Sequence, residues 1–161
     1  MTKSPLLDIG RDDRVAIGML VYSRPWLDAA EVLLNHDLPN DSHGLEFAEQ
    51  IYFLCMQSLE WSLKSFLFAS GVSKKELRYT YGHRIVKLLE KAEDLGITAL
   101  VDLSPGLMTR IRLVEPFYAA RLLQYYERFT QHAYPLPKDV VGDVATIHMA
   151  LDREYRRLCG T

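Results

Sequence analysis

The stretch that decides the fold is LEFAEQIYFLCMQSLEWSLKSFLFA, residues 45–69. Apolar or small side chains recur in it at steps of three and four, the spacing that places them on one face of an α-helix. This face consists of Leu45, Ala48, Tyr52, Cys55, Leu59, Ser62, Leu63 and Phe66. A second row, which is also partly apolar, contains Phe53, Met56, Glu60, Lys64 and Leu67. Because two rows need cover, we expect one long helix at the centre of a bundle.

Helical spacing continues through most of the remaining chain. Pro25 and Pro116 are each expected to separate two helices, since proline is tolerated in the first turn of a helix and disrupts its interior. We expect Ser104 and Pro105 to begin a helix, with the serine as the N-cap. In chain order the further predicted helices cover residues 11–22, 24–36, 83–95, 104–115, 117–133 and 138–158. In the first of them we expect Val15, Met19 and Tyr22 to face the core.

Short segments between these helices carry the residues typical of turns and caps. HDLPNDSHG at residues 36–44 has the composition of a loop, and Gly71 and Gly96 each suit the position just after a helix. Ser73 with Glu76 predicts a capping box. No segment alternates apolar and polar residues as a half-buried strand does. The sequence therefore predicts an all-α fold, an up-and-down helical bundle of four to five main helices plus short helices.

The composition is that of a globular protein large enough to bury its own core. At 161 residues with 48% hydrophobic content, we expect one domain over residues 1–161, with residues 1–10 as a loosely ordered tail. The net charge of -2 gives no general attraction for nucleic acid or anionic membrane, so such binding requires a local basic cluster. Cys55 and Cys159 form no disulfide framework, and no apolar run approaches a membrane span. We expect a cytoplasmic protein without a membrane partner.

Several motifs follow one another in a characteristic order. SLEWSLK at residues 58–64 is followed by Gly71, then by Tyr81, Gly82, His83 and Ile85, and then by the pair Leu88 and Leu89. Further on come Tyr118, Arg121 and Tyr125, with Tyr134 and Pro135. In order and separation these motifs resemble the HEPN family (higher eukaryotes and prokaryotes nucleotide-binding domain), over roughly residues 24–158.

The resemblance implies a helical bundle and two branches of function. Some HEPN proteins are metal-independent ribonucleases of toxin and antiviral systems, in which an arginine and a histidine with about four to six residues between them act at a dimer interface. Arg78 and His83 have that spacing but lie before the third main helix, whereas Arg128 and His132, nearer the family's position, have only three residues between them. Whether the chain is an enzyme therefore stays open.

The other branch consists of HEPN proteins that bind nucleotides or serve as partners of a nucleotidyltransferase. We expect a nucleotide- or RNA-binding module of the kind found in toxin–antitoxin or nucleotidyltransferase-associated systems. The alternatives are a HEPN ribonuclease and a helical scaffold that binds only a protein partner. The resemblance also implies a homodimer, with a nucleotidyltransferase or an antitoxin as a further partner.

A basic and aromatic row on the predicted helix 117–133 is the main candidate site. Its members share one face at steps of three and four: Tyr118, Arg121, Tyr125, Arg128 and His132. A separate apolar row is available to dock this helix, so the basic row is free to bind. Arginine suits phosphate contact and tyrosine suits base stacking. The alternative is a solvated face with arginine stems lying over tyrosine rings.

Lys64 and His83 are the two further candidates for a nucleotide or RNA site. His83, just before a helix, suits an anionic ligand at the helix N-terminus, or else caps and packs the loop. Lys64 joins the site if it points into a cleft shared with helix 117–133, or else it is half of an exposed or half-buried pair with Glu60. The loop His36, Asp37, Asp41 and His43 is not expected to bind metal specifically, and we expect no cofactor. No histidine follows a glutamate by three residues, which excludes a di-iron bundle.

Overall fold

The computed structural model describes residues 13–37, 47–121 and 134–160. Throughout these ranges every regular element is helical, so the predicted all-α helical bundle is confirmed. The predicted tail 1–10 and most of the predicted loop 36–44 lie outside the described residues. In chain order the elements are α1 (Asp13–Asp37), α2 (Ala48–Ala69), α3 (Lys74–Glu76), the π-helical turn η2 (Leu77–Tyr81), α4 (Ile85–Asp94), the 3₁₀ turn η3 (Ile97–Ala99), α5 (Leu107–Ala119) and α6 (Pro137–Cys159).

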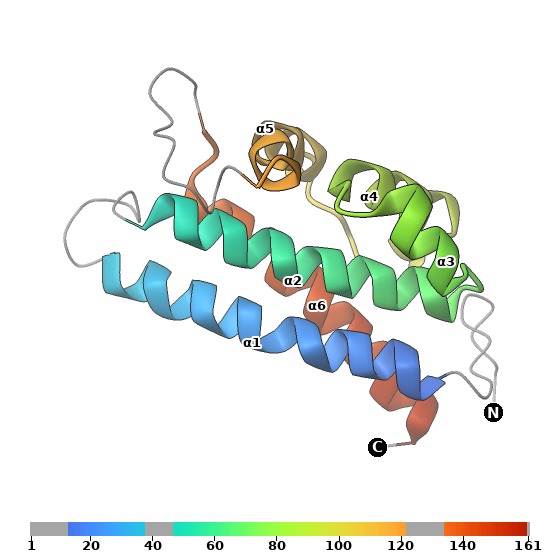
Figure 1. Ribbon diagram of the computed structural model, residues 1–161. Helices are drawn as coiled ribbons and strands as arrows, with labels where there is room; N and C mark the ends of the chain where they lie inside the picture. The colour runs from blue at the N-terminus through green and yellow to red at the C-terminus, as the bar shows by residue number, and fades with distance from the viewer. Residues whose placement is uncertain (1–12, 38–46, 122–133, 161) are drawn as a thin grey trace.

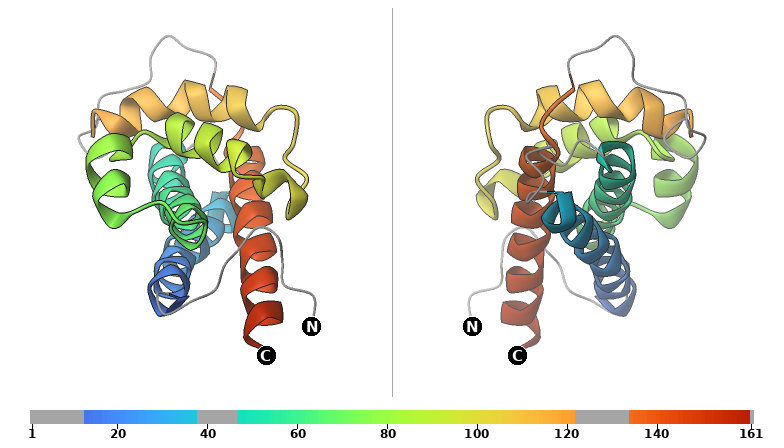
Figure 2. Two further views of the ribbon diagram at one scale, coloured as in Figure 1. Left: turned by 90° about the vertical axis from the view of Figure 1, so that its right-hand side faces the viewer. Right: turned by 90° about the vertical axis from the view of Figure 1, so that its left-hand side faces the viewer.

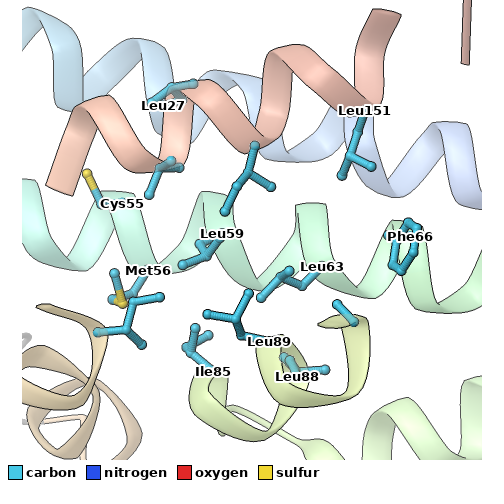
Figure 3. Packing of buried hydrophobic residues seen from close by; sticks show 14 of the residues in the cluster. Leu27, Cys55, Met56, Leu59, Leu63, Phe66, Ile85, Leu88, Leu89 and Leu151 are labelled. Carbon is cyan, nitrogen blue, oxygen red and sulfur yellow. The ribbon is translucent and has the colours of Figure 1, made fainter. Parts of the chain in front are cut away.

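The helix α2 lies at the centre of the bundle, as the sequence predicts (Figure 1). It packs against α1 and α6 on one side and against α4 and α5 on the other. The neighbouring α1 runs antiparallel to it, whereas α5 crosses it, lying lengthwise in the views of Figure 2 in which α2 is seen end-on. Figure 3 shows side chains from three other helices converging on α2: Leu27 of α1, Leu151 of α6, and Ile85, Leu88 and Leu89 of α4.

The first helix is continuous through Pro25, so the predicted break there is wrong. Pro25 is exposed and lies away from the core. Because proline has no N–H, the Val21 carbonyl loses its helical donor, and on this side of the helix it can accept a hydrogen bond from water. The buried face keeps helical spacing across the proline. It consists of Ala16, Leu20, Ser23, Leu27, Ala30 and Leu34.

The inward face predicted for the start of this helix is displaced by one residue. Tyr22 is 52% exposed, Met19 packs at the edge of the core, and Val15 is only half-buried. The error arose from treating residues 11–22 as a separate helix, because the small Ala16 and Ser23 carry the continuous stripe. Counted over the whole helix, apolar and small residues at helical spacing favour the observed face.

The predicted break at Pro116 is also wrong, because α5 continues through it to Ala119. Pro116 is exposed, while a buried row at helical spacing spans it: Leu107, Ile111, Val114 and Tyr118. The helix ends where Arg121 takes a left-handed backbone conformation, with φ of 60°, and its N–H donates to the Tyr118 carbonyl over 3.0 Å. A helix over 117–133 therefore does not begin at Phe117, and residues 122–133 lie outside the described chain.

Ser104 does not cap α5, contrary to the prediction, because the helix begins at Leu107 after Gly106. The Ser104 hydroxyl instead donates to the Asp143 carboxylate of α6 over 2.8 Å. Arg110 donates to the same carboxylate from Nε at 2.6 Å and from a terminal nitrogen at 2.9 Å. This two-point contact ties α5 to α6.

Other predicted boundaries are confirmed. Ser73 and Glu76 form the capping box, and the glycines after α2 and α4, Gly71 and Gly96, have φ of 95° and 88°. The predicted helix 83–95 corresponds to α4 and 138–158 to α6, each within two residues. None of the helices in the described ranges combines the length and apolar character that a bilayer-spanning segment needs.

A buried polar network joins α1, α2 and α6. The Ser62 hydroxyl donates to Ser23 Oγ over 3.1 Å, and Ser23 Oγ lies 2.9 Å from His148 Nδ1. One turn along α2, Ser65 donates to the Ala16 carbonyl over 2.6 Å and lies 2.9 Å from the Tyr155 hydroxyl. Ser62, which the sequence places on the apolar or small face of the central helix, thus belongs to a network of polar groups that satisfy one another across the core.

Candidate functional site

Three of the predicted site residues meet on a single buried carboxylate, that of Glu60 in α2. Glu60 is 2% exposed. Lys64 Nζ donates to Oε1 over 2.6 Å, and the Tyr118 hydroxyl donates to Oε2 over 2.6 Å. His83 Nδ1 lies 2.9 Å from Oε2. We call Glu60, Lys64, His83 and Tyr118 the Glu60 cluster; it joins α2, the turn before α4, and α5.

The helix itself supplies the countercharge of Glu60. Lys64 follows Glu60 by four residues, which places both side chains on one face of α2. The Lys64 side chain is only 11% exposed, and its ammonium also lies 5.7 Å from the centre of the Trp61 ring. A carboxylate in the core needs a partner of opposite charge and full hydrogen bonding, and Lys64 provides the charge. The half-buried pair considered from the sequence is therefore one part of a larger cluster.

His83 connects the buried carboxylate to the protein surface. Gly82, with φ of 57°, turns the chain ahead of α4 and presents the imidazole to Glu60. The His83 side chain is nevertheless 53% exposed. Because an ionised carboxylate only accepts hydrogen bonds, Nδ1 must carry the proton in this contact. Nε2 is then the ring nitrogen left for a ligand or for water.

Tyr118 is buried, at 4% exposure, so its ring is not open for stacking on a base. Burial, followed by the negative charge of Glu60, raises the pKa of its phenol well above the ordinary range. Its ring meets His83 edge-on, with 6.2 Å between ring centres. Tyr118 thus fixes the carboxylate and packs the imidazole; it does not form part of an exposed basic and aromatic row.

Of the remaining predicted residues the structure describes only Arg121. Arg121 is exposed just after α5 ends, and its left-handed conformation takes it off the helical face predicted for Tyr118 and Arg121 together. Tyr125, Arg128 and His132 lie outside the described residues.

The amino end of α4 holds a carboxylate of this protein, not an open anion site. The Val86 N–H donates to a Glu115 carboxylate oxygen of α5 over 2.9 Å. A negative group at this position suits both the free amide groups and the helix dipole. An external anion at His83 would therefore be held by side chains, and not by the N-terminus of α4.

His83 lies in a basic and aromatic stretch, residues 78–84, in which Arg78, Tyr79 and Arg84 are exposed and were not predicted as ligand-binding residues. The turn η2 in this stretch is π-helical, a form that occurs often at functional sites. Arg78 lies over the ring of Tyr79 at 5.3 Å, and Tyr79 is 69% exposed. Arg84 donates to the carbonyls of Thr80 and Tyr81, which leaves an exposed guanidinium beside His83. The signal was present in the sequence RYTYGHR, where arginines at both ends enclose two tyrosines and a histidine.

The role of Glu60 was also missed from the sequence. Its signal is an acidic residue in a row that is apolar apart from Lys64, since a buried carboxylate there requires more donors than one lysine supplies. For metals, the described chain contains no group of three or more histidine, cysteine, aspartate or glutamate side chains placed to bind an ion.

The site can be described chemically as an exposed imidazole oriented by a buried carboxylate, with the exposed residues Arg78, Tyr79 and Arg84 close to it in the chain. Comparisons of the chain with models of protein families, with curated proteins and with solved structures give no match.

Proposed function

We propose that this chain is a HEPN-like module that binds a phosphate-bearing ligand, a nucleotide or RNA, at His83 and the adjoining stretch 78–84. The observation that carries the proposal is that His83 is held through Nδ1 by buried Glu60 while about half of its side chain remains exposed. A fixed imidazole loses less freedom on binding than a mobile one, so its orientation favours recognition. The resemblance in motif order, from SLEWSLK to His83, supports the same reading.

The neighbouring side chains suit this class of ligand. Arg78 and Arg84 are exposed cations near His83 in the chain, and guanidinium groups contact phosphate oxygens with two parallel hydrogen bonds. Tyr79 offers an exposed ring on which a base can stack. His83 Nε2 accepts a hydrogen bond when the ring is neutral and donates to phosphate when it is charged.

The test compares binding of labelled single-stranded RNA and of nucleotides by the wild type and by two variants, at two salt concentrations. We expect the double variant Arg78→Ala with Arg84→Ala to bind more weakly. Its binding should also depend less on salt: the slope of the logarithm of the binding constant against the logarithm of the salt concentration should fall by about one per lost phosphate contact. Arg157→Ala is the control, since Arg157 is an exposed arginine at the far end of α6. Equal binding by wild type and double variant, or binding by neither, would overturn the proposal.

A second candidate is a metal-independent ribonuclease, favoured by the same Glu60 contact. A carboxylate that fixes one nitrogen of an imidazole leaves the other positioned to take a proton from a ribose hydroxyl. If the chain has this activity, the wild type should cleave RNA in the presence of a metal chelator, and the His83→Ala variant should not. Binding without cleavage would remove the candidate.

Self-association belongs to the proposed function, because the resemblance implies a homodimer that works beside a nucleotidyltransferase or an antitoxin protein. Light scattering at micromolar concentration tests it directly. A monomer under those conditions would contradict the dimer without bearing on the site at His83.

A further inference from the structure

A groove with a volume of about 820 Å³ lies between α1 and α6, on the opposite side of α2 from the Glu60 cluster. The two helices spread apart toward the carboxyl end of α6, as both views in Figure 2 show. Ile17, Leu20 and Met149 give the groove apolar walls. Its size is that of a site for a small organic molecule.

Pro25 leaves the backbone carbonyl of Val21, a residue that lines this groove, without its helical donor. Val21 and Pro25 both line the groove. In an unbroken helix the residue at position 25 would donate its N–H to that carbonyl, and proline has no N–H to donate. The carbonyl is consequently available to a ligand that carries a hydroxyl or an N–H group.

His148, which is 5% exposed and lines the groove, adds a second acceptor. The Ser23 hydroxyl donates its only proton to the Leu20 carbonyl over 2.6 Å, so toward His148 the Ser23 oxygen acts as an acceptor. His148 Nδ1, 2.9 Å away, must then carry a proton. Burial, followed by the charge of Arg24, lowers the pKa of His148, which keeps Nε2 unprotonated and able to accept.

The rim of the groove is cationic. Arg24, Arg153 and Arg156 line it, against one lining carboxylate, Asp152. Arg156 is paired with Asp152 over 2.8 Å and Arg24 with Asp28 over 2.6 Å. Arg153 has no ion pair with any residue that the structure describes and is exposed. Its guanidinium is the group best placed to meet an added anion.

We propose that the α1–α6 groove binds a small amphipathic acid: an apolar body with an anionic group for the arginine rim and a hydroxyl or N–H donor for the Val21 carbonyl and His148. This inference goes beyond the proposed nucleotide or RNA site and does not depend on it. Arginine donors, the apolar walls, the solvent-side Val21 carbonyl and the buried His148 are together complementary to that combination of groups.

The first experiment uses 8-anilinonaphthalene-1-sulfonate, which has an aromatic body, a sulfonate and one N–H, as a fluorescent probe of the whole protein. Arg153→Ala should weaken binding about fivefold, as expected for one exposed charge contact of about 1 kcal/mol. Met149→Trp should weaken binding, because the larger indole occupies part of the apolar wall on which the probe would lie. Arg157→Ala and Val32→Trp are the matched controls, because both residues are exposed on the same two helices and neither lines the groove.

Competition distinguishes the chemical features of the ligand. We expect 10-hydroxydecanoate to displace the probe better than decanoate, which lacks the donor, and better than 1,10-decanediol, which lacks the anion. Equal displacement by the three compounds would overturn the proposed ligand class. Probe binding that Met149→Trp leaves unchanged, in a variant with wild-type thermal unfolding, would overturn the site.

Discussion

Replacing Glu60 with glutamine tests the central inference about the site, because it removes a buried charge while keeping the shape of the side chain. Three donors meet the Glu60 carboxylate: the Lys64 ammonium at 2.6 Å, the Tyr118 hydroxyl at 2.6 Å and His83 Nδ1 at 2.9 Å. Glutamine offers one acceptor oxygen and places an NH₂ group where the second oxygen was. At least one donor then faces another donor, and the ammonium loses its countercharge.

The size of the effect follows from how deeply each group is buried. Breaking a fully buried ion pair costs about 3–5 kcal/mol, and the partial exposure of Lys64 and His83 lowers this to about 2–4 kcal/mol for Glu60→Gln. In a domain of this length each kcal/mol lowers Tm by about 2–4 °C, so we expect Tm to fall by roughly 5–15 °C.

Thermal and urea unfolding of the wild type and of Glu60→Gln measure this loss. The matched control is Glu90→Gln, since Glu90 is half exposed and meets Arg112 only at 3.4 Å. We expect the control to change the free energy of unfolding by less than about 1 kcal/mol.

An effect of Glu60→Gln no larger than that of Glu90→Gln would refute the reasoning. A double-mutant cycle with Lys64→Met gives an independent check, because residues in one network should show an interaction energy above about 0.5 kcal/mol. Additive effects of the two substitutions would mean that the contact seen in the structure contributes nothing to stability.

Three further results are expected. Ser58→Ala should leave the free energy of unfolding unchanged or raise it, because the buried Ser58 hydroxyl has no hydrogen-bond partner among the described residues. Ser65→Ala should lower the free energy of unfolding by about 1–2 kcal/mol, because two hydrogen bonds are lost. Urea unfolding of the two variants measures both effects. A chromogenic disulfide reagent for thiols should react only with the exposed Cys159 in the native protein and with both cysteines in denaturant. Cys55 is protected because it is buried, and burial raises the pKa of its thiol. Stability should decline as pH falls below about 6.5, because the pKa of His148 is lowered in the folded state and the unfolded chain takes up the proton first; a urea series from pH 7.5 to 5 that is flat, or that matches His148→Gln, would contradict this.

Fold class and the central helix were predictable because they depend on hydrophobic spacing, which is a local property of the sequence. The errors fell at Pro25 and Pro116, where the general effect of proline on a helix competed with packing. In both helices the apolar stripe continues through the proline and the ring faces solvent, so burial of the stripe outweighs the loss of one hydrogen bond.

The site was only partly predictable, for a different reason. Lys64, His83 and Tyr118 were each identified from the sequence, but for separate reasons and with different expected surroundings. Their common partner, Glu60, acts through contacts that span 23 residues to His83 and 58 residues to Tyr118. No periodicity in one sequence reports such distances, so the cluster became visible only when the fold was known.

The buried serine, histidine and tyrosine network between α1, α2 and α6 also limits how these helices can slide past one another. Apolar side chains tolerate many alternative packings, whereas Ser23 finds His148, and Ser65 finds Tyr155, in one register only. Moving α6 by a single turn, about 5.4 Å, would separate both pairs while leaving leucines and valines against other leucines and valines. Each buried polar group left without its partner costs about 1–3 kcal/mol, so the nearest shifted arrangement lies several kcal/mol above the native one. These few polar atoms give the core a single arrangement, which apolar contacts alone would specify only weakly.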